Sequence, residues 1–402
     1  MKPSSDTAAI EELLARGVEK VYPSTDFLRS KLTKGERLTI YLGADPTAPS
    51  LHIGHMIPAL KLRAFQQLGH KIIFLIGDFT ATIGDPDKLS VREPLTHEQV
   101  LANAALYAEQ MSKVLSFEGE NAAEVKHNAE WLSKLSFADI LNLTSKITHS
   151  QIVSRDMFQK RIAEGKELYL HEFLYPVMQG YDSLAMDVDG EVGGNDQTFN
   201  MLVGRDLLKK IKGKEKFVLT TKLLADSEGV KMGKTTGNMV ALTDSSEDMF
   251  GKIMSWSDSM IVPGFELCTL VSQESIKKIT EELESGINPI EKKRELAWHV
   301  VALFHSKEDA DRALDRFQSV VQNKEIPEEI PEVSAQKGDL LGEIVLASGL
   351  TKSKGEFRRL VEEGAVSNLL TEETIKDPSE TFAGAPLTLK IGKRRFLKIV
   401  LG

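Results

Sequence analysis

Two short motifs in this sequence could together hold a polyphosphate. His52 and His55 lie three residues apart in LHIGH, so on a helix they would share one face of its first turn. Free backbone N–H groups and the positive end of the helix dipole favour phosphate at that position. Lys231 and Lys234 lie in the polar, glycine-containing stretch KMGKT. Such a stretch suits a loop that closes on phosphate groups.

Taken singly, each motif also has an ordinary structural interpretation. The histidines could simply cap a helix that follows a strand and a turn, and the lysines could belong to a basic surface loop. KMGKT is not a P-loop, because the GxxxxGK[ST] pattern is not found there. A metal site at His52 and His55 is not expected, because the HExxH pattern and a cysteine partner are both missing.

A third motif, YPVMQGYD, could form the wall of a polar pocket. Tyr175, Gln179 and Asp182 follow one another at spacings of four and three residues, which places them on one face of a helix. The alternative is a hydrogen-bonded cluster inside the core. A ligand with a phenol group would need both a donor and an acceptor, and Tyr41 with Asp182 could supply them. Leaving such a pair unsatisfied beside a phenylalanine ring would be costly.

The segments that must position these motifs predict an α/β fold. Short apolar or β-branched runs occupy 37–43, 71–77, 183–188 and 217–220. A helical pattern over 55–69 lies between the first two of these runs. The alternation is typical of a doubly wound, Rossmann-like parallel sheet, which binds ligands at the carboxyl ends of its strands. After residue 245 apolar spacings of three and four predict an all-α region up to about 325.

Composition narrows the class of protein. The chain has 402 residues, of which 41% are hydrophobic, and a formal net charge of −9, so non-specific binding of nucleic acid by the whole surface is not expected. No apolar run reaches the roughly 18 residues of a membrane helix, and the N-terminus lacks the apolar core of a signal peptide. Cys268 is the only cysteine, which excludes an internal disulfide. We therefore expect a cytoplasmic protein of several domains.

The end of the chain differs from the rest in charge. Residues 337–402 contain 11 Lys or Arg and nine Asp or Glu, so this tail is slightly basic whereas 1–336 is strongly acidic. The sign changes just after EIPEEIPEVSAQKG (325–338), whose prolines and acidic residues are typical of an exposed linker. The sequence thus predicts a small basic module attached to a large acidic body.

Five motifs, taken in order, make the sequence similar to one enzyme family. HIGH after the first strand and a KMSKS-like loop after the last are the paired signature of class I aminoacyl-tRNA synthetases. YLGADPTAPSLHIGH, IGDP, YPVMQGYDS, GGNDQ and KMGKT resemble the bacterial tyrosyl-tRNA synthetases in particular. The resemblance implies a tyrosine–tRNA ligase, which forms tyrosyl-adenylate and pyrophosphate from L-tyrosine and ATP and then transfers tyrosine to the 3′-terminal adenosine of tRNA(Tyr).

The resemblance implies a set of tyrosine-binding residues. They are Tyr41, Asp45, Asp85, Tyr175, Gln179, Asp182 and Gln197, the last beside the substrate carboxylate. Tyr41 and Asp182 match the ligands of the substrate hydroxyl. Asp85, Tyr175 and Gln179 match the ligands of its α-ammonium group.

It also implies an ATP site and a set of catalytic residues. The residues that match the ATP site are Gly43, His52, Gly54, His55, Gly194, Asp196, Lys231 and Lys234, and those that match the catalytic set are Thr47, His52, His55, Lys231, Lys234, Thr235, Lys88 and Arg92. Asp196 matches the ribose ligand, and Thr47 with His52 matches phosphate ligands. A solvated loop is the alternative for Lys88 and Arg92. Mg²⁺ is expected to accompany ATP, and no metal bound by the protein itself is predicted.

The tail resembles the S-four type (alpha-L motif) RNA-binding domain. Its candidate RNA-binding residues are Lys352, Lys354, Arg358, Arg359, Lys393, Arg394 and Arg395, and phosphate contacts are the chemistry that such charges suit. A solvated helix face is the alternative. The predicted domains are a Rossmann-like catalytic domain over 1–244, with HIGH at 46–55 and the KMSKS-like motif at 231–235, a helical anticodon-side domain over 245–324, a linker over 325–337, and the α+β RNA-binding domain over 338–402.

Partners and alternatives complete the prediction. The family forms homodimers, through a segment that corresponds to residues around 125–175, and binds tRNA(Tyr). A tryptophanyl-tRNA synthetase shares the fold, but it would not need both Tyr41 and Asp182 to face a phenol. A catalytically silent RNA-binding homologue would have no need for His52 or Lys234. An adenylyltransferase with an acceptor other than tRNA would make the tail superfluous.

Overall fold

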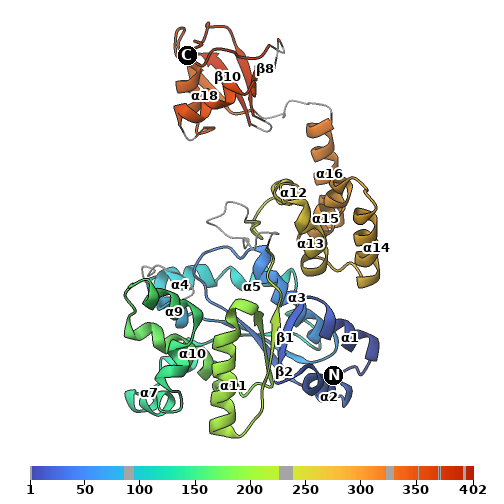
Figure 1. Ribbon diagram of the computed structural model, residues 1–402, viewed down its shortest axis with the longest axis vertical. Helices are drawn as coiled ribbons and strands as arrows, with labels where there is room; N and C mark the ends of the chain where they lie inside the picture. Colours follow the sequence, from blue (N-terminus) through green and yellow to red (C-terminus); the bar gives the residue numbers. More distant parts are fainter. Residues whose placement is uncertain are drawn as a thin grey trace. The chain divides into compact units, whose positions relative to one another are not determined.

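The computed structural model describes residues 2–85, 95–225, 239–322 and 330–402, except 352, 370, 372, 393 and 394. The chain forms two compact units, Met1–Leu314 and Asp315–Gly402. Each unit contains its own sheet (Figure 1). Several residues with predicted roles lie outside the described part of the chain, namely Lys88, Arg92, Lys231, Lys234, Thr235, Lys352, Lys393 and Arg394.

The first unit is built on a mostly parallel sheet with the strand order β1-β6-β5-β2-β3-β4. Its strands are β1 (Val18–Tyr22), β2 (Thr39–Ala44), β3 (Lys71–Ile76), β4 (Glu124–His127), β5 (Gly190–Gly194) and β6 (Phe217–Thr221). All neighbouring strands are parallel except β1, which runs antiparallel to β6 at one edge. The predicted strands at 37–43, 71–77 and 217–220 are therefore present, and the predicted α/β fold is confirmed.

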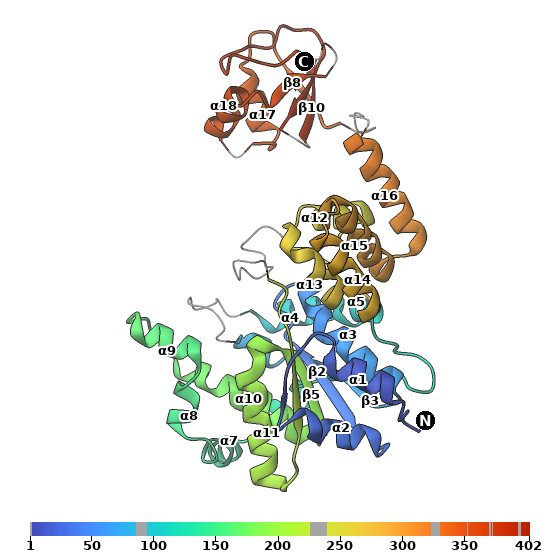
Figure 2. The ribbon, with the colours of Figure 1, turned by 45° about the vertical axis from the view of Figure 1, so that its right-hand side comes forward.

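Helices cover both faces of this sheet. In Figures 1 and 2, α10 (Leu170–Met186) and α11 (Thr198–Lys212) lie on one side of the strands, and α3 (Ile53–Gln67) lies on the other with α1 (Thr7–Ala15). The remaining helices of this part are α2 (Thr25–Thr33), η1 (Thr80–Thr82), α4 (His97–Ala104), α5 (Tyr107–Ser112), α6 (Ala129–Leu132), α7 (Phe137–Thr144), α8 (His149–Val153), α9 (Asp156–Ala163) and η2 (Asn195–Gln197). The sheet is thus doubly wound.

The strand predicted over 183–188 is wrong. Residues 183–186 complete α10, and Asp187 caps the helix in the left-handed conformation, at φ 51°. The strand that follows, β5, has the sequence GEVGG. Glycine has a low intrinsic preference for strands, so this segment gave no strand signal although it is buried between β2 and β6.

Close packing of α10 on α11 depends on small residues. A Cβ atom on Gly180 would lie 3.3 Å from the Cα of Gly204 and 2.9 Å from Cδ1 of Leu207. The two helix backbones approach so closely that a larger residue at either glycine would force them apart. This packing fixes the orientation of α10, the helix that carries the YPVMQGYD motif.

Only helices follow the first sheet in the described residues up to 322. They are α12 (Ser246–Met254), η4 (Asp258–Met260), α13 (Ile261–Cys268), α14 (Gln273–Glu284), α15 (Pro289–Phe304) and α16 (Lys307–Gln322). The all-α region expected from the apolar spacings is present. Helix α13 also contacts α3, so this region packs against the helix that begins in the HIGH motif.

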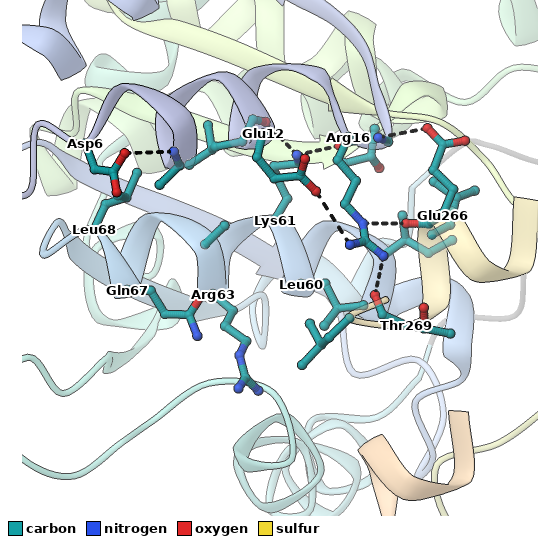
Figure 3. Close-up of a pocket in the computed structure, with 18 of the residues that line it drawn as sticks. Asp6, Glu12, Arg16, Leu60, Lys61, Arg63, Gln67, Leu68, Glu266 and Thr269 are labelled. Atoms are coloured by element: carbon teal, nitrogen blue, oxygen red, sulfur yellow. Dashed lines mark hydrogen bonds and ion pairs between the residues drawn. The ribbon is translucent and has the colours of Figure 1, made fainter. Parts of the chain in front are cut away.

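Two basic side chains, the partly buried Arg16 and the buried Lys61, join the N-terminal segment to this framework (Figure 3). The Arg16 guanidinium donates to the carbonyl oxygens of Phe265, Glu266, Thr269 and Val271, at and beyond the end of α13. Lys61 of α3 donates to the carbonyls of Leu13 and Arg16 at the end of α1. Cations are favoured at helix C-termini, where carbonyl groups lack helical partners. A cavity of about 420 Å³ lies beside this junction, and none of the predicted site residues lines it.

Burial of Lys61 makes the stability of the protein dependent on pH. Desolvation lowers the pKa of this lysine to about 7, whereas an unfolded lysine titrates near 10.4. Between these values the unfolded chain binds more protons, so the free energy of unfolding rises with pH. We expect the free energy of unfolding of the wild type, measured with urea, to rise relative to that of Lys61→Met. The rise should be about 1 kcal/mol per pH unit from pH 7.5 to 9.5.

Lys34, the exposed residue that caps the C-terminus of α2, provides the control. Lys34→Met is expected to follow the wild-type pH dependence. A constant difference between the wild type and Lys61→Met would show that the carbonyls of Leu13 and Arg16 keep the Lys61 ammonium charged throughout this range.

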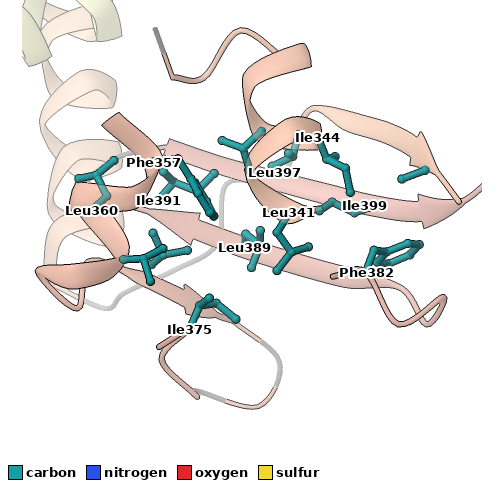
Figure 4. Close-up of a cluster of buried hydrophobic side chains, with 14 residues drawn as sticks. Leu341, Ile344, Phe357, Leu360, Ile375, Phe382, Leu389, Ile391, Leu397 and Ile399 are labelled. Carbon is teal, nitrogen blue, oxygen red and sulfur yellow. The ribbon is translucent and has the colours of Figure 1, made fainter. Parts of the chain in front are cut away.

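The C-terminal unit is a small α+β module with a core of its own (Figure 4). Its sheet has the order β7-β10-β9-β8, formed by β7 (Glu332–Ala335), β8 (Val366–Asn368), β9 (Leu387–Ile391) and β10 (Arg395–Leu401). Helices α17 (Leu341–Ala347) and α18 (Lys354–Glu362) pack on it through buried residues such as Val345 and Phe357. Every member of this core cluster comes from residues 335–399.

The linker predicted over 325–337 is too long. Glu332–Ala335 forms β7, which pairs in parallel with the end of β10. Ala335 is buried in the core and Val333 packs against it. This strand was not identified from the sequence because Pro331 and acidic residues lie around it, and proline inside or beside a strand weakens the strand signal.

Candidate active site

The predicted tyrosine-binding and ATP-binding residues that the structure describes gather where the direction of the chain changes in the sheet. From β2 the chain passes through α3 to β3 on one side, whereas β5 lies on the other side of β2. Ligands of open α/β sheets bind in the crevice at the carboxyl ends of such strands. Gly43 is exposed at the end of β2, and a Cβ atom added to it would come no closer than 3.9 Å to any neighbour. The space above β2 is therefore open to a ligand.

The two histidines of HIGH form the start of α3. His52 is the N-cap residue, and its Nδ1 accepts from Gly54 N–H at 3.2 Å. His55 Nδ1 accepts in turn from His52 N–H at 3.2 Å, and the two rings lie 3.9 Å apart. A Cβ atom on Gly54 would meet the His52 ring at 2.9 Å. The capping interpretation is confirmed. The phosphate interpretation stays a prediction, and the same turn presents a helix N-terminus and two imidazoles.

Tyr41 and Asp182 are the most buried of the predicted tyrosine ligands, 1% and 2% exposed. The Asp182 carboxylate accepts from Trp131 Nε1–H at 2.7 Å and from Asn128 Nδ2–H at 3.3 Å. The Tyr41 hydroxyl lies 3.0 Å from Ser183 Oγ. Burial is the main cause that raises the pKa of Tyr41 and of Asp182 well above their ordinary values.

A chain of hydrogen bonds links Asp182 to Tyr175. Asn128 donates to Thr80 Oγ1 at 3.0 Å as well as to Asp182. Thr80 donates to Asp45 Oδ1 at 2.8 Å, and the Tyr175 hydroxyl donates to Asp45 Oδ2 at 2.8 Å. The structure therefore brings Asp45 and Asp182 into one network with Tyr175.

Asp85 lies in a second group at the edge of the same site. Its Oδ2 accepts from Gln197 Nε2 at 2.9 Å, and its Oδ1 pairs with Arg155 at 2.7 Å. The charges of Asp45, Asp85 and Asp182 add to burial in raising the pKa of Tyr175 well above its ordinary value. Three carboxylates thus surround one hydroxyl, which is an arrangement that attracts a substrate ammonium group.

The other predicted residues occupy the rim of the site. Gln179 donates its amide to Glu191 Oε1 at 3.1 Å, which directs its carbonyl oxygen away from Glu191. Asp196 is exposed in η2 at the end of β5. A Cβ atom on Gly194 would lie 2.6 Å from Asp196 Oδ1, so a larger residue there would displace the Asp196 side chain. Thr47 follows β2, where its N–H donates to the Asp45 carbonyl at 2.8 Å.

Sequence reasoning missed several polar residues that hold the predicted tyrosine-binding side chains in place. Asn128 and Trp131 fix Asp182, and Arg155 holds Asp85. Lys216 and Glu191 form a fully buried ion pair behind Tyr41. Each acts across 50 or more residues of sequence or between two strands, so no local spacing indicated it. The NAEW segment at 128–131 offered only the presence of a tryptophan beside polar residues.

The described basic residues of the tail differ in accessibility. Lys354, Arg358 and Arg359 are exposed on α18. Arg395, in contrast, donates to the Leu350 carbonyl and pairs with Glu356 at 2.8 Å within the same unit. Lys354 pairs with Glu343 at 2.6 Å and Arg359 with Glu363 at 3.7 Å, so these exposed cations also have acidic partners within the tail.

Comparison with known proteins identifies the family. A family model described as "tRNA synthetases class I (W and Y)" matches residues 33–322. The tyrosine–tRNA ligases of Carboxydothermus hydrogenoformans and Aromatoleum aromaticum are each 41% identical to this chain. The first alignment covers 97% of both chains, and the second covers 99% of this chain and 100% of the relative. A C-terminally truncated mitochondrial tyrosyl-tRNA synthetase of Aspergillus nidulans matches with a TM-score of 0.66 at 26% identity, covering 78% of this chain and 94% of that one.

The chain therefore belongs to the class I aminoacyl-tRNA synthetases, and within that class to the tyrosine–tRNA ligases. Enzymes of this family use ATP to join tyrosine to its tRNA, and the predicted enzyme class is confirmed. None of the helices in the described ranges has the length and apolar character that a membrane crossing requires.

Proposed function

We propose that the crevice between β2 and β5 binds L-tyrosine, with its phenol at the closed end and its α-amino acid group toward Asp85. The observation that supports this proposal is the Tyr41–Asp182 pair, which is closed off from solvent. Trp131 and Asn128 hold the carboxylate in place. A hydroxyl placed there would donate to Asp182 and accept from Tyr41. Phenylalanine would leave both groups unsatisfied, at a cost of about 1–3 kcal/mol for each.

In the first step a carboxylate oxygen of tyrosine attacks the α-phosphorus of ATP. The new O–P bond forms as the bond to the bridging oxygen breaks, and pyrophosphate leaves. The carboxylate is already ionised at neutral pH, so no general base is needed. Negative charge grows on the phosphates, and groups that meet it best in the transition state accelerate the step.

Groups on both sides of the crevice fit this role. His52 and His55 sit at the N-terminus of α3, where backbone N–H groups and the helix dipole favour the phosphates. Asp196, exposed at the end of β5, is suited to the ribose hydroxyls. Lys231, Lys234 and Thr235 are assigned to the leaving pyrophosphate by their motif. Mg²⁺ enters as part of the ATP substrate and neutralises triphosphate charge.

In the second step a hydroxyl of the terminal adenosine of tRNA(Tyr) attacks the carbonyl carbon of the adenylate, and AMP leaves. The exposed basic face of α18 supports a role of the tail in binding the tRNA backbone. No step requires a thiol, which agrees with the burial of Cys268.

We also propose a homodimer that involves residues around 125–175. Large apolar side chains are exposed in this segment, with Phe137 at 74% and Leu170 at 84% exposed, and Leu141, Ile162 and Tyr169 are also exposed. Contiguous exposed apolar groups favour association. A monomer in sedimentation velocity at micromolar concentration would contradict this proposal. A cytoplasmic location stays a prediction from the sequence.

The test of the site is amino-acid-dependent ATP–pyrophosphate exchange. Tyrosine should support exchange with a kcat/KM far above that of phenylalanine, and tryptophan should not support it. Exchange with tryptophan would overturn the assignment of Tyr41 and Asp182. No exchange from folded protein would favour a silent RNA-binding homologue, and exchange without transfer to tRNA would favour an adenylyltransferase with another acceptor.

Lys234→Ala should slow adenylate formation at least tenfold while leaving tyrosine binding nearly unchanged. The lysine is assigned to charge that develops on the leaving group, so its loss raises the barrier more than it weakens the ground state. Pre-steady-state adenylate formation gives the rate, and equilibrium dialysis gives the tyrosine affinity. A large loss of tyrosine affinity would contradict the role of the lysine.

A further inference from the structure

A buried ion pair lies directly behind the tyrosine-binding face of the sheet. Lys216 immediately precedes β6, and Glu191 lies in the neighbouring strand β5. Both side chains are closed off from solvent, at 0% and 2% exposed. Ser183 of α10, also fully buried, accepts from Lys216 Nζ at 2.8 Å.

We propose that Lys216 is a positioning residue that sets the direction of the hydrogen bonds at Tyr41 and thereby contributes to the selection of tyrosine over phenylalanine. It acts through Ser183 and Glu191. The inference rests on the proposed role of Tyr41 and Asp182 in binding the substrate hydroxyl.

The first part of the argument concerns Ser183. A lysine ammonium has only donors, so Lys216 must donate to Ser183 Oγ and the serine proton must point elsewhere. Among the described residues, the acceptor at hydrogen-bond distance from that hydroxyl is Tyr41 Oη, at 3.0 Å. Ser183 therefore donates to Tyr41. The Tyr41 hydroxyl, having accepted this bond, keeps its own proton for another partner.

The second part concerns Glu191, which competes for that proton. The Glu191 carboxylate adds to burial in raising the pKa of the Tyr41 hydroxyl, so the two groups lie close together. Both carboxylate oxygens are already engaged, Oε2 by Lys216 and Oε1 by Gln179 at 3.1 Å. With these partners in place, the hydrogen bond between the Tyr41 hydroxyl and Glu191, which also raises the pKa of that hydroxyl, is weakened. The oxygen of a substrate phenol can then take the Tyr41 proton in place of Glu191.

The third part concerns charge. Asp182 and Glu191 are two buried carboxylates, and the charge of Glu191 contributes to raising the pKa of Asp182, after burial as the main cause. Lys216 supplies a compensating positive charge that faces both of them. Without it, one of the two carboxyl groups would be driven to its neutral form. Lys216 thus favours the ionised form of Asp182 against burial and the charge of Glu191.

The test compares tyrosine and phenylalanine in ATP–pyrophosphate exchange. The variants are Ser183→Ala, Lys216→Met, Tyr41→Phe and the double variant Tyr41→Phe/Ser183→Ala. Lys214→Met is the matched control. Lys214 lies only two residues before Lys216, but it pairs with Asp189 and does not contact Ser183 or Glu191. ATP KM and thermal unfolding are measured for every variant.

We expect Ser183→Ala and Lys216→Met each to lower kcat/KM for tyrosine about tenfold, while kcat/KM for phenylalanine and the ATP KM stay unchanged. In the Tyr41→Phe background, Ser183→Ala should cause no further loss, because its effect passes through the Tyr41 hydroxyl. Lys214→Met should behave as the wild type.

Equal losses for tyrosine and phenylalanine, or full additivity with Tyr41→Phe, would overturn the inference and leave Ser183 and Lys216 as structural residues. If Lys216→Met fails to fold because Glu191 is left unpaired, the isosteric Ser183→Ala variant still decides the question. If Tyr41→Phe itself leaves the tyrosine preference unchanged, the proposed tyrosine site is wrong, which is a different failure from that of the inference.

Discussion

An Asp182→Asn enzyme is expected to lose about 100-fold in kcat/KM for tyrosine in ATP–pyrophosphate exchange. Trp131 Nε1–H and Asn128 Nδ2–H both donate to the native carboxylate. An asparagine offers these two donors a single acceptor oxygen. Its own N–H groups would face one of the donors, which then has no acceptor. The substrate hydroxyl also loses a charged acceptor in a site without solvent. Binding and chemistry should suffer together, because the phenol anchors the whole substrate.

The control for this variant is Asp189→Asn. Asp189 accepts from Thr39 N–H at 2.9 Å where β2 begins, at the opposite end of that strand from the site. The Asp189→Asn variant should keep kcat/KM for tyrosine in exchange within about twofold of the wild type. Burial raises the pKa of Asp182, so the wild-type kcat/KM for tyrosine should increase with pH as this carboxyl ionises, and Asp182→Asn should lose that increase. An unchanged kcat/KM in Asp182→Asn would remove Asp182 from the tyrosine site.

Deletion of residues 330–402 is expected to leave tyrosine activation within about twofold of the wild type while reducing transfer to tRNA by about 100-fold. The tail core is formed by residues 335–399 alone, so the deletion removes that core as a whole. The phosphate contacts assigned to Lys354, Arg358 and Arg359 would be lost, and several such contacts contribute strongly to RNA affinity. The cut precedes β7, because that strand belongs to the tail sheet.

Exchange and aminoacylation should be assayed on the same preparation. The triple variant Lys354→Ala/Arg358→Ala/Arg359→Ala is the milder companion, and its tRNA KM should increase and depend less steeply on salt than that of the wild type. Aminoacylation at the wild-type rate by the deleted enzyme would remove the tail from the mechanism. Loss of exchange as well would show that the deletion damages the first unit.

The sequence predicted the features that repeat locally. The spacing of Tyr175, Gln179 and Asp182 placed them on one helix, and α10 carries them as expected. The runs that became β2, β3 and β6 were apolar enough to be identified. Strand β5 was missed because its glycines, required where Phe217 and Asp196 lie close to the backbone, carry no strand signal.

Long-range polar partners could not be predicted in the same way. Arg155 meets Asp85 across 70 residues of sequence, and Lys216 meets Glu191 only because β5 and β6 are neighbours. Nothing in the local sequence distinguishes Lys216 from the lysines at 212 and 214. Its burial depends on the register of two strands, which the tertiary fold determines.

The anchoring of the N-terminal segment has a consequence for how the chain is made. Arg16 binds carbonyls of residues 265–271, and β1 pairs with β6. A nascent chain emerging from the ribosome cannot complete these contacts until roughly 250 further residues have been synthesised, which takes on the order of 10–50 s. Arg16 and β1 must therefore wait for their partners, although Leu13 and Arg16 can already accept from Lys61. The sheet edge that β1 covers cannot close before β6 has been made.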